Sequence, residues 1–445
     1  ARAQERQKEA PPPPGTPKGF TLPARSEITL PNGMGVTLVQ YGITPKVDID
    51  LVLRVGSVDE GPNEVWLGRV MADMMSEGTT TRSAEQIARD AADMGGSVDV
   101  SFGSDQSDVS GSALSEFAPR MVALVADLAR HPTFPDSQLP RIIADRRRQL
   151  AIARSEPQSL ALEKFQDALY PTSAYGRVFP TEAMLGAYTT AQLRAFYAAH
   201  VSAARAHLYV VGKFDSAAVE RAVRAAFGDW APGTPAAPTT AAATSTRRIY
   251  LIDRPGAVQT TLYIGLPVVD PSSPDFIPLQ VTNALLGGSF SSRITSNIRE
   301  RKGYTYTPFS LVTSFYRSAY WVEEADVTTS VTGASLKEIF GEIDRLRREA
   351  PPADELRGIQ NYLAGTFVLR NSSRGGITAQ LAFVRLHGLS DHYLADYVKN
   401  VYAVTPADVQ RIAATYLDPD RMTIVAVGDK RAIEGQLQPY GAIVQ

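Results

Sequence analysis

The spacing of hydrophobic positions predicts helices and strands over most of the chain. Apolar residues recur three and four positions apart, the period of amphipathic helices, at 65–75, 117–130, 139–155, 334–350 and 353–368. Short β-rich or alternating runs, which favour strands, occupy 97–104, 107–114 and 318–327. Strands come first and helices later in two successive stretches, so the pattern predicts an α+β protein with two similar mixed α/β-sheet domains.

The two stretches end in the same pattern. Residues 189–212 and residues 405–428 are equally long, and each segment begins with a threonine. Gln192 or Asp408 follows three residues later, which is the spacing of a capping box. Each segment continues as an amphipathic helix and closes with a strand that stops at glycine. This agreement indicates an internal duplication.

A segment rich in Pro, Ala and Thr, residues 231–247, separates the stretches and predicts a linker. We therefore expect an N-terminal domain at 25–230 and a C-terminal domain at 248–445. Residues 1–24 are charged and then Pro-rich, which predicts a disordered tether. The first residue is Ala, as expected after removal of an export signal peptide, which favours a periplasmic or otherwise exported protein; trimming of the natural chain predicts the same start.

Composition excludes several kinds of site. The chain has no cysteine, which excludes disulfides, thiolate nucleophiles and Cys–zinc sites. It has five histidines, and no two of them lie four residues apart, so no helix carries a two-His metal site. A net charge of −2 argues against a nucleic-acid partner, and no apolar run approaches the roughly 18 residues of a membrane span.

Three local motifs resemble those of a known family. GSVDE at 56–60 precedes a predicted helix, GT at 78–79 follows it, and LLGGSFSSRITSNIRERKGYTY occupies 285–306. Together with the duplicated α+β halves, these motifs resemble the pitrilysin/insulinase family of zinc metallopeptidases, the inverzincins. The similarity is greatest to the short bacterial and mitochondrial-processing-peptidase-like branch, and it covers nearly everything from about residue 27 to 430.

The resemblance implies that the zinc-binding positions of this chain are degenerate. The family carries H-x-x-E-H on the first-half helix and a third ligand, Glu, about 75 residues downstream. These positions fall here on Arg69, Ala72 and Asp73, and near Gln149. We therefore expect this chain to bind no zinc, and we expect Arg69 and Asp73 to form a surface i,i+4 ion pair in the vacated site. We interpret Arg146–Arg148 as a solvated helix face.

The second-half motif of the family is intact. It pairs an Arg on a helix with a Tyr on the following strand, with six residues between them, and here these are Arg299 and Tyr306. The resemblance implies that Tyr306 hydrogen-bonds the scissile carbonyl and stabilises the oxyanion, while Arg299 orients the substrate. A phenol donor and a fixed cation suit developing negative charge. Without the family comparison, the same residues would be a helix-end Arg and a half-buried strand Tyr.

Two further stretches are candidate substrate-binding residues. They are Gly287, Gly288 and Ser289 in the second half, and Ser101, Phe102 and Gly103 in the first. The glycines lie where the non-catalytic subunit of the processing peptidase has a glycine-rich substrate loop, and a helix C-cap is the alternative. A phosphate loop is disfavoured because no Lys has the required spacing. The first-half stretch ends a predicted edge strand that would pair with an extended peptide by β-augmentation.

These expectations leave two functions open. In the first, the chain is the non-zinc-binding subunit of a heterodimeric zinc endopeptidase that hydrolyses a peptide or unfolded protein. This chain then binds no cofactor, and a homologous subunit carrying H-x-x-E-H holds the zinc. The retained spacing of Arg299 and Tyr306 favours this function. In the second, the chain is a catalytically inert peptide-binding or scaffolding pseudopeptidase, and the Arg/Tyr pair is simply inherited.

Overall fold

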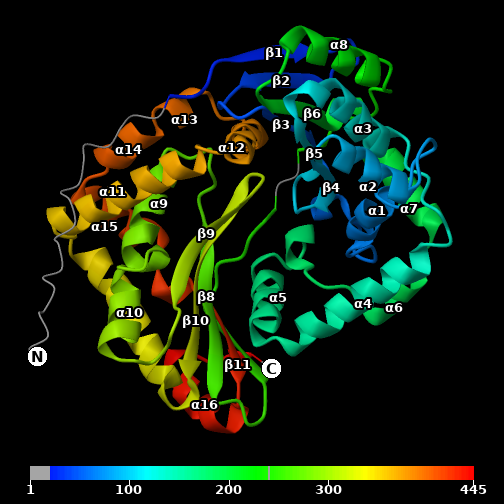
Figure 1. Cartoon of the computed structure of the whole chain (residues 1–445). Helices are drawn as coiled ribbons and strands as arrows, with labels where there is room; N and C mark the ends of the chain where they lie inside the picture. Colours follow the sequence, from blue (N-terminus) through cyan, green and yellow to red (C-terminus); the bar gives the residue numbers. More distant parts are fainter. Residues whose placement is uncertain (1–20, 239–240, 445) are drawn as a thin grey trace, which may run out of the picture.

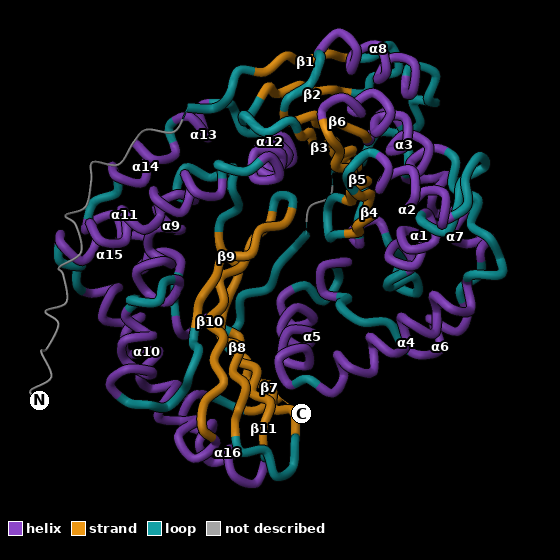
Figure 2. Tube along the Cα trace, viewed as in Figure 1, coloured by secondary structure: helices purple, strands orange, loops and turns teal. Residues whose placement is uncertain are grey.

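The computed structural model describes residues 21–238 and 241–444, and each half of the chain is built on a six-stranded mixed sheet (Figures 1 and 2). The first sheet has the order β1-β2-β6-β3-β5-β4. Its strands are β1 (Arg25–Thr29), β2 (Gly35–Gln40), β3 (Lys46–Leu53), β4 (Ser97–Phe102), β5 (Ser107–Leu114) and β6 (Ala206–Gly212). Strands β2 and β6 are parallel, and the remaining neighbours are antiparallel.

The second sheet repeats this arrangement with the order β12-β7-β11-β8-β10-β9. Its strands are β7 (Arg248–Asp253), β8 (Gln259–Val268), β9 (Phe309–Phe315), β10 (Ser318–Thr328), β11 (Thr423–Gly428) and β12 (Ile443–Val444). Strands β7 and β11 are parallel, as their counterparts β2 and β6 are, and β8 runs antiparallel to β11 as β3 does to β6. Only the outer strands β1 and β12 differ in direction. The sheet order therefore confirms the duplication.

The amphipathic segments predicted at 65–75, 117–130, 139–155, 334–350 and 353–368 correspond to helices within two residues at each end, and the structure has further helices that the pattern did not predict. The first half contains α1 (Leu67–Met75), α2 (Ala84–Asp93), α3 (Ala118–Arg130), α4 (Leu139–Ser155), α5 (Pro157–Leu169), α6 (Glu182–Ala187), α7 (Thr190–His200) and α8 (Ser216–Phe227). The second contains α9 (Phe276–Asn283), α10 (Thr332–Arg348), α11 (Ala353–Arg370), α12 (Arg374–His387), α13 (His392–Ala395), α14 (Tyr397–Ala403), α15 (Pro406–Tyr416) and α16 (Lys430–Leu437), and two π-helical segments, η5 (Ala284–Gly288) and η6 (Thr295–Arg301). Both predicted capping boxes are present, at the starts of α7 and α15.

Each sheet has one face covered by helices of its own half and the other face covered partly by a helix of the other half. Helix α5, from the first half, packs on β8 and β11 of the second sheet, where Phe165 contacts the rings of Tyr263 and Tyr320. Helix α12, from the second half, packs on β3 and β6 of the first sheet, where Leu381 joins a cluster with Tyr209. The halves are therefore joined by two shared apolar clusters.

The segments predicted as tether and linker contain no helix or strand where they are described. This holds for residues 21–24 and for 231–238 and 241–247, whereas residues 1–20 and 239–240 of these predictions lie outside the described residues. In the described part of the chain, no helix combines the length and apolar character needed to cross a membrane.

Candidate functional site

Helix α1 carries the degenerate zinc-ligand positions and keeps a firmly built scaffold. Seven of its nine residues are buried, which leaves Arg69 and Asp73 facing outward. The buried carboxylate of Glu60 accepts hydrogen bonds from the backbone N–H groups of Trp66 (3.1 Å) and Gly68 (2.9 Å) and so satisfies donors at the helix start. Burial raises the pKa of Glu60 to about 7 although these hydrogen bonds oppose the shift. The helix start is thus fixed independently of any metal.

Asp73 pairs with an arginine of α4 rather than with Arg69, so the predicted Arg69–Asp73 ion pair is wrong. The guanidinium of Arg146 donates Nε to one carboxylate oxygen of Asp73 (2.6 Å) and Nη2 to the other (2.5 Å). Helix α4 packs on α1 and presents this planar guanidinium to the Asp73 carboxylate. Arg69, which lies on α1 together with Asp73, does not form this two-point contact. The Arg69 guanidinium lies instead 5.7 Å from the Trp66 ring centroid.

Arg146 also reaches the position that corresponds to the third zinc ligand. Its Nη1 donates to the Gln149 side-chain oxygen at 2.8 Å. The side chain of Arg146 is only 17% exposed, so the interpretation of Arg146–Arg148 as a solvated face is wrong for its first residue; Arg148 is 68% exposed and fits it. One guanidinium therefore joins Asp73 and Gln149, two of the positions that hold metal in the family.

These residues do not fit a zinc ion. Position 72 is a buried alanine, Asp73 is already neutralised by a cation, and Gln149 supplies no carboxylate. Across residues 21–238 and 241–444, no group of three or more His, Cys, Asp or Glu side chains is placed to hold a metal.

Strand β4 lies at the edge of the first sheet, as predicted, and its end is tightly packed against α1. A Cβ placed on Gly68 would lie 2.0 Å from the ring of Phe102, so this ring rests directly on the α1 backbone. Ser101 is exposed and donates to Asp108 (3.3 Å), while the Gly103 carbonyl accepts from the backbone N–H of Ser57 (3.0 Å). Phe102 therefore supports α1, and pairing of this edge with a peptide stays a prediction.

The structure brings Arg299 and Tyr306 together on the surface of the second half. Arg299 lies in the last turn of η6, and its guanidinium lies 5.0 Å from the ring centroid of Tyr306 and 4.5 Å from that of Phe290. Tyr306 lies in the loop between η6 and β9, so its predicted place on a strand is wrong. Gly303, with φ +64°, lies in the turn that brings the chain back after η6.

Tyr306 and Phe290 are unusually exposed for aromatic residues, at 77% and 70%. Arg299 lies between their two rings and also contacts the Glu300 carboxylate, 3.1 Å from its Nε. Two exposed rings therefore hold one cation by cation–π attraction, with the Tyr306 hydroxyl free of hydrogen bonds to described residues. We call Phe290, Arg299 and Tyr306 the Arg299 cluster.

Gly287 and Gly288 end η5, shortly before Phe290 in the sequence. Close packing explains why position 287 is a glycine. A Cβ placed on Gly287 would lie 2.5 Å from Ser310 Oγ and 2.6 Å from Glu323 Oε2. Neither glycine has positive φ, so the left-handed C-cap that usually requires glycine is absent here. Ser289, the next residue, is buried, and its hydroxyl has no hydrogen-bond partner among the described residues.

Glu323 on β10 is fully buried beside Gly287. Neither carboxylate oxygen has a hydrogen-bond partner among the described residues, and burial raises the pKa of this carboxyl well above its usual range. Gly287 is therefore packed against a carboxyl group whose burial favours its neutral form.

Sequence reasoning missed Arg146, Glu60 and Phe290. Arg146 lies one helical turn before Gln149 on α4, so the two side chains share one face of that helix. If α4 had been expected to pack on α1, this spacing would have placed the Arg146 cation beside Asp73. Phe290 gave no periodic signal because it lies in a short loop between two π-helical segments.

Both halves of the chain match models of known protein families. Residues 36–179 match the family model described as insulinase (peptidase family M16), and residues 187–363 match the model described as the peptidase M16 inactive domain. An uncharacterized zinc protease of Streptomyces coelicolor is 24% identical over 91% of this chain and 90% of its own length. Another, from Mycobacterium tuberculosis, is 25% identical over 83% of this chain and 82% of its own.

Solved structures show the same fold. A crystal structure of a peptidase M16 inactive domain from Pseudomonas fluorescens has a TM-score of 0.84 and 24% identity, covering 91% of this chain and 98% of that one. A protease from Helicobacter pylori has a TM-score of 0.85 and 18% identity, covering 92% and 100%. The matches to both family models, one in each half of a duplicated fold, show that the chain belongs to the insulinase/pitrilysin family of peptidases, family M16.

Proposed function

We propose that this chain is the non-zinc-binding subunit of a heterodimeric zinc metalloendopeptidase. A homologous subunit with H-x-x-E-H binds the zinc, and this chain contributes the Arg299 cluster to peptide hydrolysis in that site. The observation that carries the proposal is the contrast between the two halves. In the first half a guanidinium occupies the ligand positions, whereas in the second half Arg299 and Tyr306 are grouped and accessible.

The exposure of Tyr306 argues against a purely structural role. A tyrosine gains stability by burying its ring, and a ring that is 77% exposed gains little of it. Its hydroxyl has no partner among described residues, so it can donate to a carbonyl oxygen that approaches from solvent. Tyr306 would then donate a hydrogen bond to the oxyanion that forms when the peptide carbonyl is attacked.

Arg299 would orient the substrate rather than act on a proton. Its side chain is 24% exposed and is held between two rings, so it presents a fixed positive charge with limited freedom of rotation. A guanidinium fixed in this way can hold a peptide carbonyl or carboxylate beside the Tyr306 hydroxyl. The free edge of β4 would bind an extended segment of the same peptide through backbone hydrogen bonds.

The test is reconstitution of the chain with a homologue that carries H-x-x-E-H, encoded in the same genome. The chain alone should hold no stoichiometric zinc by elemental analysis and should not cleave a quenched fluorescent peptide, whereas the pair should cleave it. Tyr306→Phe removes one oxyanion donor and should lower kcat about 10²–10³-fold without affecting assembly. Tyr362→Phe, another exposed tyrosine of the second half, is the matched control.

The alternative is an inert peptide-binding or scaffolding pseudopeptidase. It would be supported if the pair assembles and Tyr306→Phe leaves kcat unchanged. Zinc near one ion per isolated chain would contradict both functions, because it would show that the assignment of Arg69, Ala72 and Asp73 to the ligand positions is wrong.

A further inference from the structure

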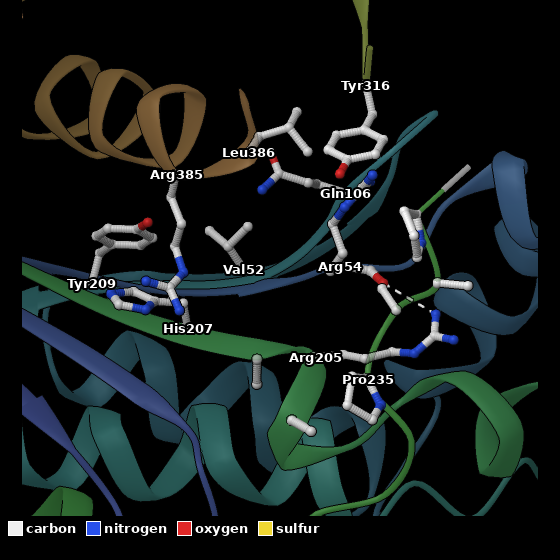
Figure 3. Close-up of a pocket in the computed structure, with 15 residues that line it drawn as sticks. Val52, Arg54, Gln106, Arg205, His207, Tyr209, Pro235, Tyr316, Arg385 and Leu386 are labelled. Atoms are coloured by element: carbon white, nitrogen blue, oxygen red, sulfur yellow. Dashed lines mark hydrogen bonds between the residues drawn. The ribbon is translucent and has the colours of Figure 1, made fainter. Parts of the chain in front are cut away.

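A cavity of about 340 Å³ lies where the two halves meet, and it shares no residue with the Arg299 cluster. Its floor is formed by the first-half strands β3 and β6, and one wall is the Pro235–Pro238 part of the linker. The second half supplies Tyr316, from the turn between β9 and β10, and Arg385 from α12. Figure 3 shows Arg385 reaching from α12 toward His207 on β6.

The lining is cationic. Arg54, Arg205 and Arg385 line the cavity, and no carboxylate does. Arg54 is paired with Asp105 (3.2 Å) and Arg205 with Asp59 (3.0 Å), both outside the lining. The Arg385 side chain has no ion pair or hydrogen bond with any described residue, so its charge is not compensated by the protein.

Several polar groups around Arg385 also lack a hydrogen-bond partner among the described residues. His207 is buried, and its Nδ1 has no partner, while its Nε2 lies 2.7 Å from Thr37 Oγ1. In the tautomer in which the Thr37 hydroxyl donates to Nε2, Nδ1 carries the proton. The hydroxyls of Tyr209 and Tyr316 make no hydrogen bond with described residues either.

Gly35 allows Arg385 and His207 to approach one another. A Cβ placed on Gly35 would lie 2.3 Å from His207 Nδ1 and 3.4 Å from Arg385 Nη2, so any larger residue would displace the imidazole. Burial, followed by the charge of Arg385, lowers the pKa of His207 to about 3, so the ring is neutral at physiological pH. The Arg385 cation and the neutral His207 ring therefore lie side by side against Gly35.

We propose that this cavity binds a small anion that carries phosphate or carboxylate groups, with Arg385 as the anchoring residue. A guanidinium presents parallel N–H donors that match both groups, and His207, Tyr209 and Tyr316 would satisfy the remaining oxygens. The volume of the cavity lies at the lower end of the range typical of small-molecule sites. Because its walls come from both halves and the linker, the bound anion would hold them together and stabilise the folded chain by mass action.

The test is isothermal titration of the full chain with inorganic phosphate, pyrophosphate and citrate, at an ionic strength held constant with sodium chloride. Saturable binding of at least one anion is expected. The preferred anion distinguishes a phosphate from a carboxylate ligand. Arg385→Gln should weaken binding about tenfold or more, because it removes charge-assisted hydrogen bonds.

Arg221→Gln is the matched control, since Arg221 is an exposed arginine on α8 with the same charge and no place in the cavity. It should bind like the wild type. The proposal is overturned if none of the three anions binds, or if Arg385→Gln binds as tightly as Arg221→Gln. Arg385 is exposed and unpaired, so its replacement should leave the melting temperature of the ligand-free chain unchanged.

Discussion

The Arg146 guanidinium should weaken zinc binding even when the family ligands are restored. The perturbation is a variant with Arg69→His, Ala72→Glu, Asp73→His and Gln149→Glu, made with and without Arg146→Ala. In the variant that keeps Arg146, the hydrogen bond from Arg146 to Gln149 becomes an ion pair with the new carboxylate. Zinc must then compete with Arg146 for its third ligand.

The magnitude follows from charge and distance. A zinc ion bound to residues 73 and 149 would lie about 5 Å from the guanidinium, because Arg146 now contacts both side chains at 2.5–2.8 Å. Charges of +1 and +2 at that separation repel by about 3 kcal/mol at an effective dielectric constant of about 40. This energy corresponds to a loss of about 10²-fold in zinc affinity.

The assay is competition for zinc against a chromophoric chelator, with circular dichroism to verify that the variants are folded. The variant with Arg146→Ala should bind zinc about 10²-fold more tightly than the one that keeps Arg146. Arg148→Ala in the same background is the control, because Arg148 lies on the same helix but pairs with Asp145. Equal affinity with and without Arg146 would refute the electrostatic reasoning, and no zinc binding in any variant would refute the alignment of the ligand positions.

Three further predictions concern the second half. Because burial raises the pKa of Glu323, the folded state keeps a proton that the unfolded chain releases above about pH 4, and folding stability falls as pH rises from there. Glu323→Gln should therefore raise the melting temperature by a margin that grows from about pH 5 to pH 7. A margin that stays constant over this range would contradict the prediction. Gly287→Ala should cost about 1–3 kcal/mol in chemical denaturation because its methyl meets Ser310 and Glu323, whereas Gly341→Ala, with nothing within 4 Å, should stabilise by about 0.5–1 kcal/mol. Phe290→Ala removes one ring from Arg299, a contact worth about 0.5–1 kcal/mol, and should lower kcat of the reconstituted pair a few-fold, less than Tyr306→Phe does; an unchanged kcat would mean that the Phe290 ring does not position Arg299.

The elements of this fold could be predicted from sequence because their signals are local. The capping boxes at α7 and α15 and the amphipathic period of α3 and α4 depend on residues within a few positions of one another. The two capping-box segments also revealed the duplication, which in turn predicted two similar α+β domains. Helix α5 was not among the predicted segments, and no local signal indicated its place on the second sheet.

The site was predicted less completely, for a related reason. The Arg69–Asp73 pair was expected because residues four apart on a helix are neighbours, but Arg146, 73 positions away, offers a better fork to Asp73. Tyr306 was assigned to a strand, although the chain turns at Gly303 and returns to Arg299 before β9 begins. In both cases the deciding contact joins elements whose relative placement depends on tertiary packing.

The shared apolar clusters mean that the linker is not what keeps the two halves together. The chain packs against the second sheet at α5 and returns to the first half at α6 (Figure 1). It then crosses to the second half through residues 231–247. Phe165 and Leu381 each belong to a cluster that contains buried residues of both halves. A protease that cut the linker would therefore leave the two halves held together by these clusters rather than release two separate domains.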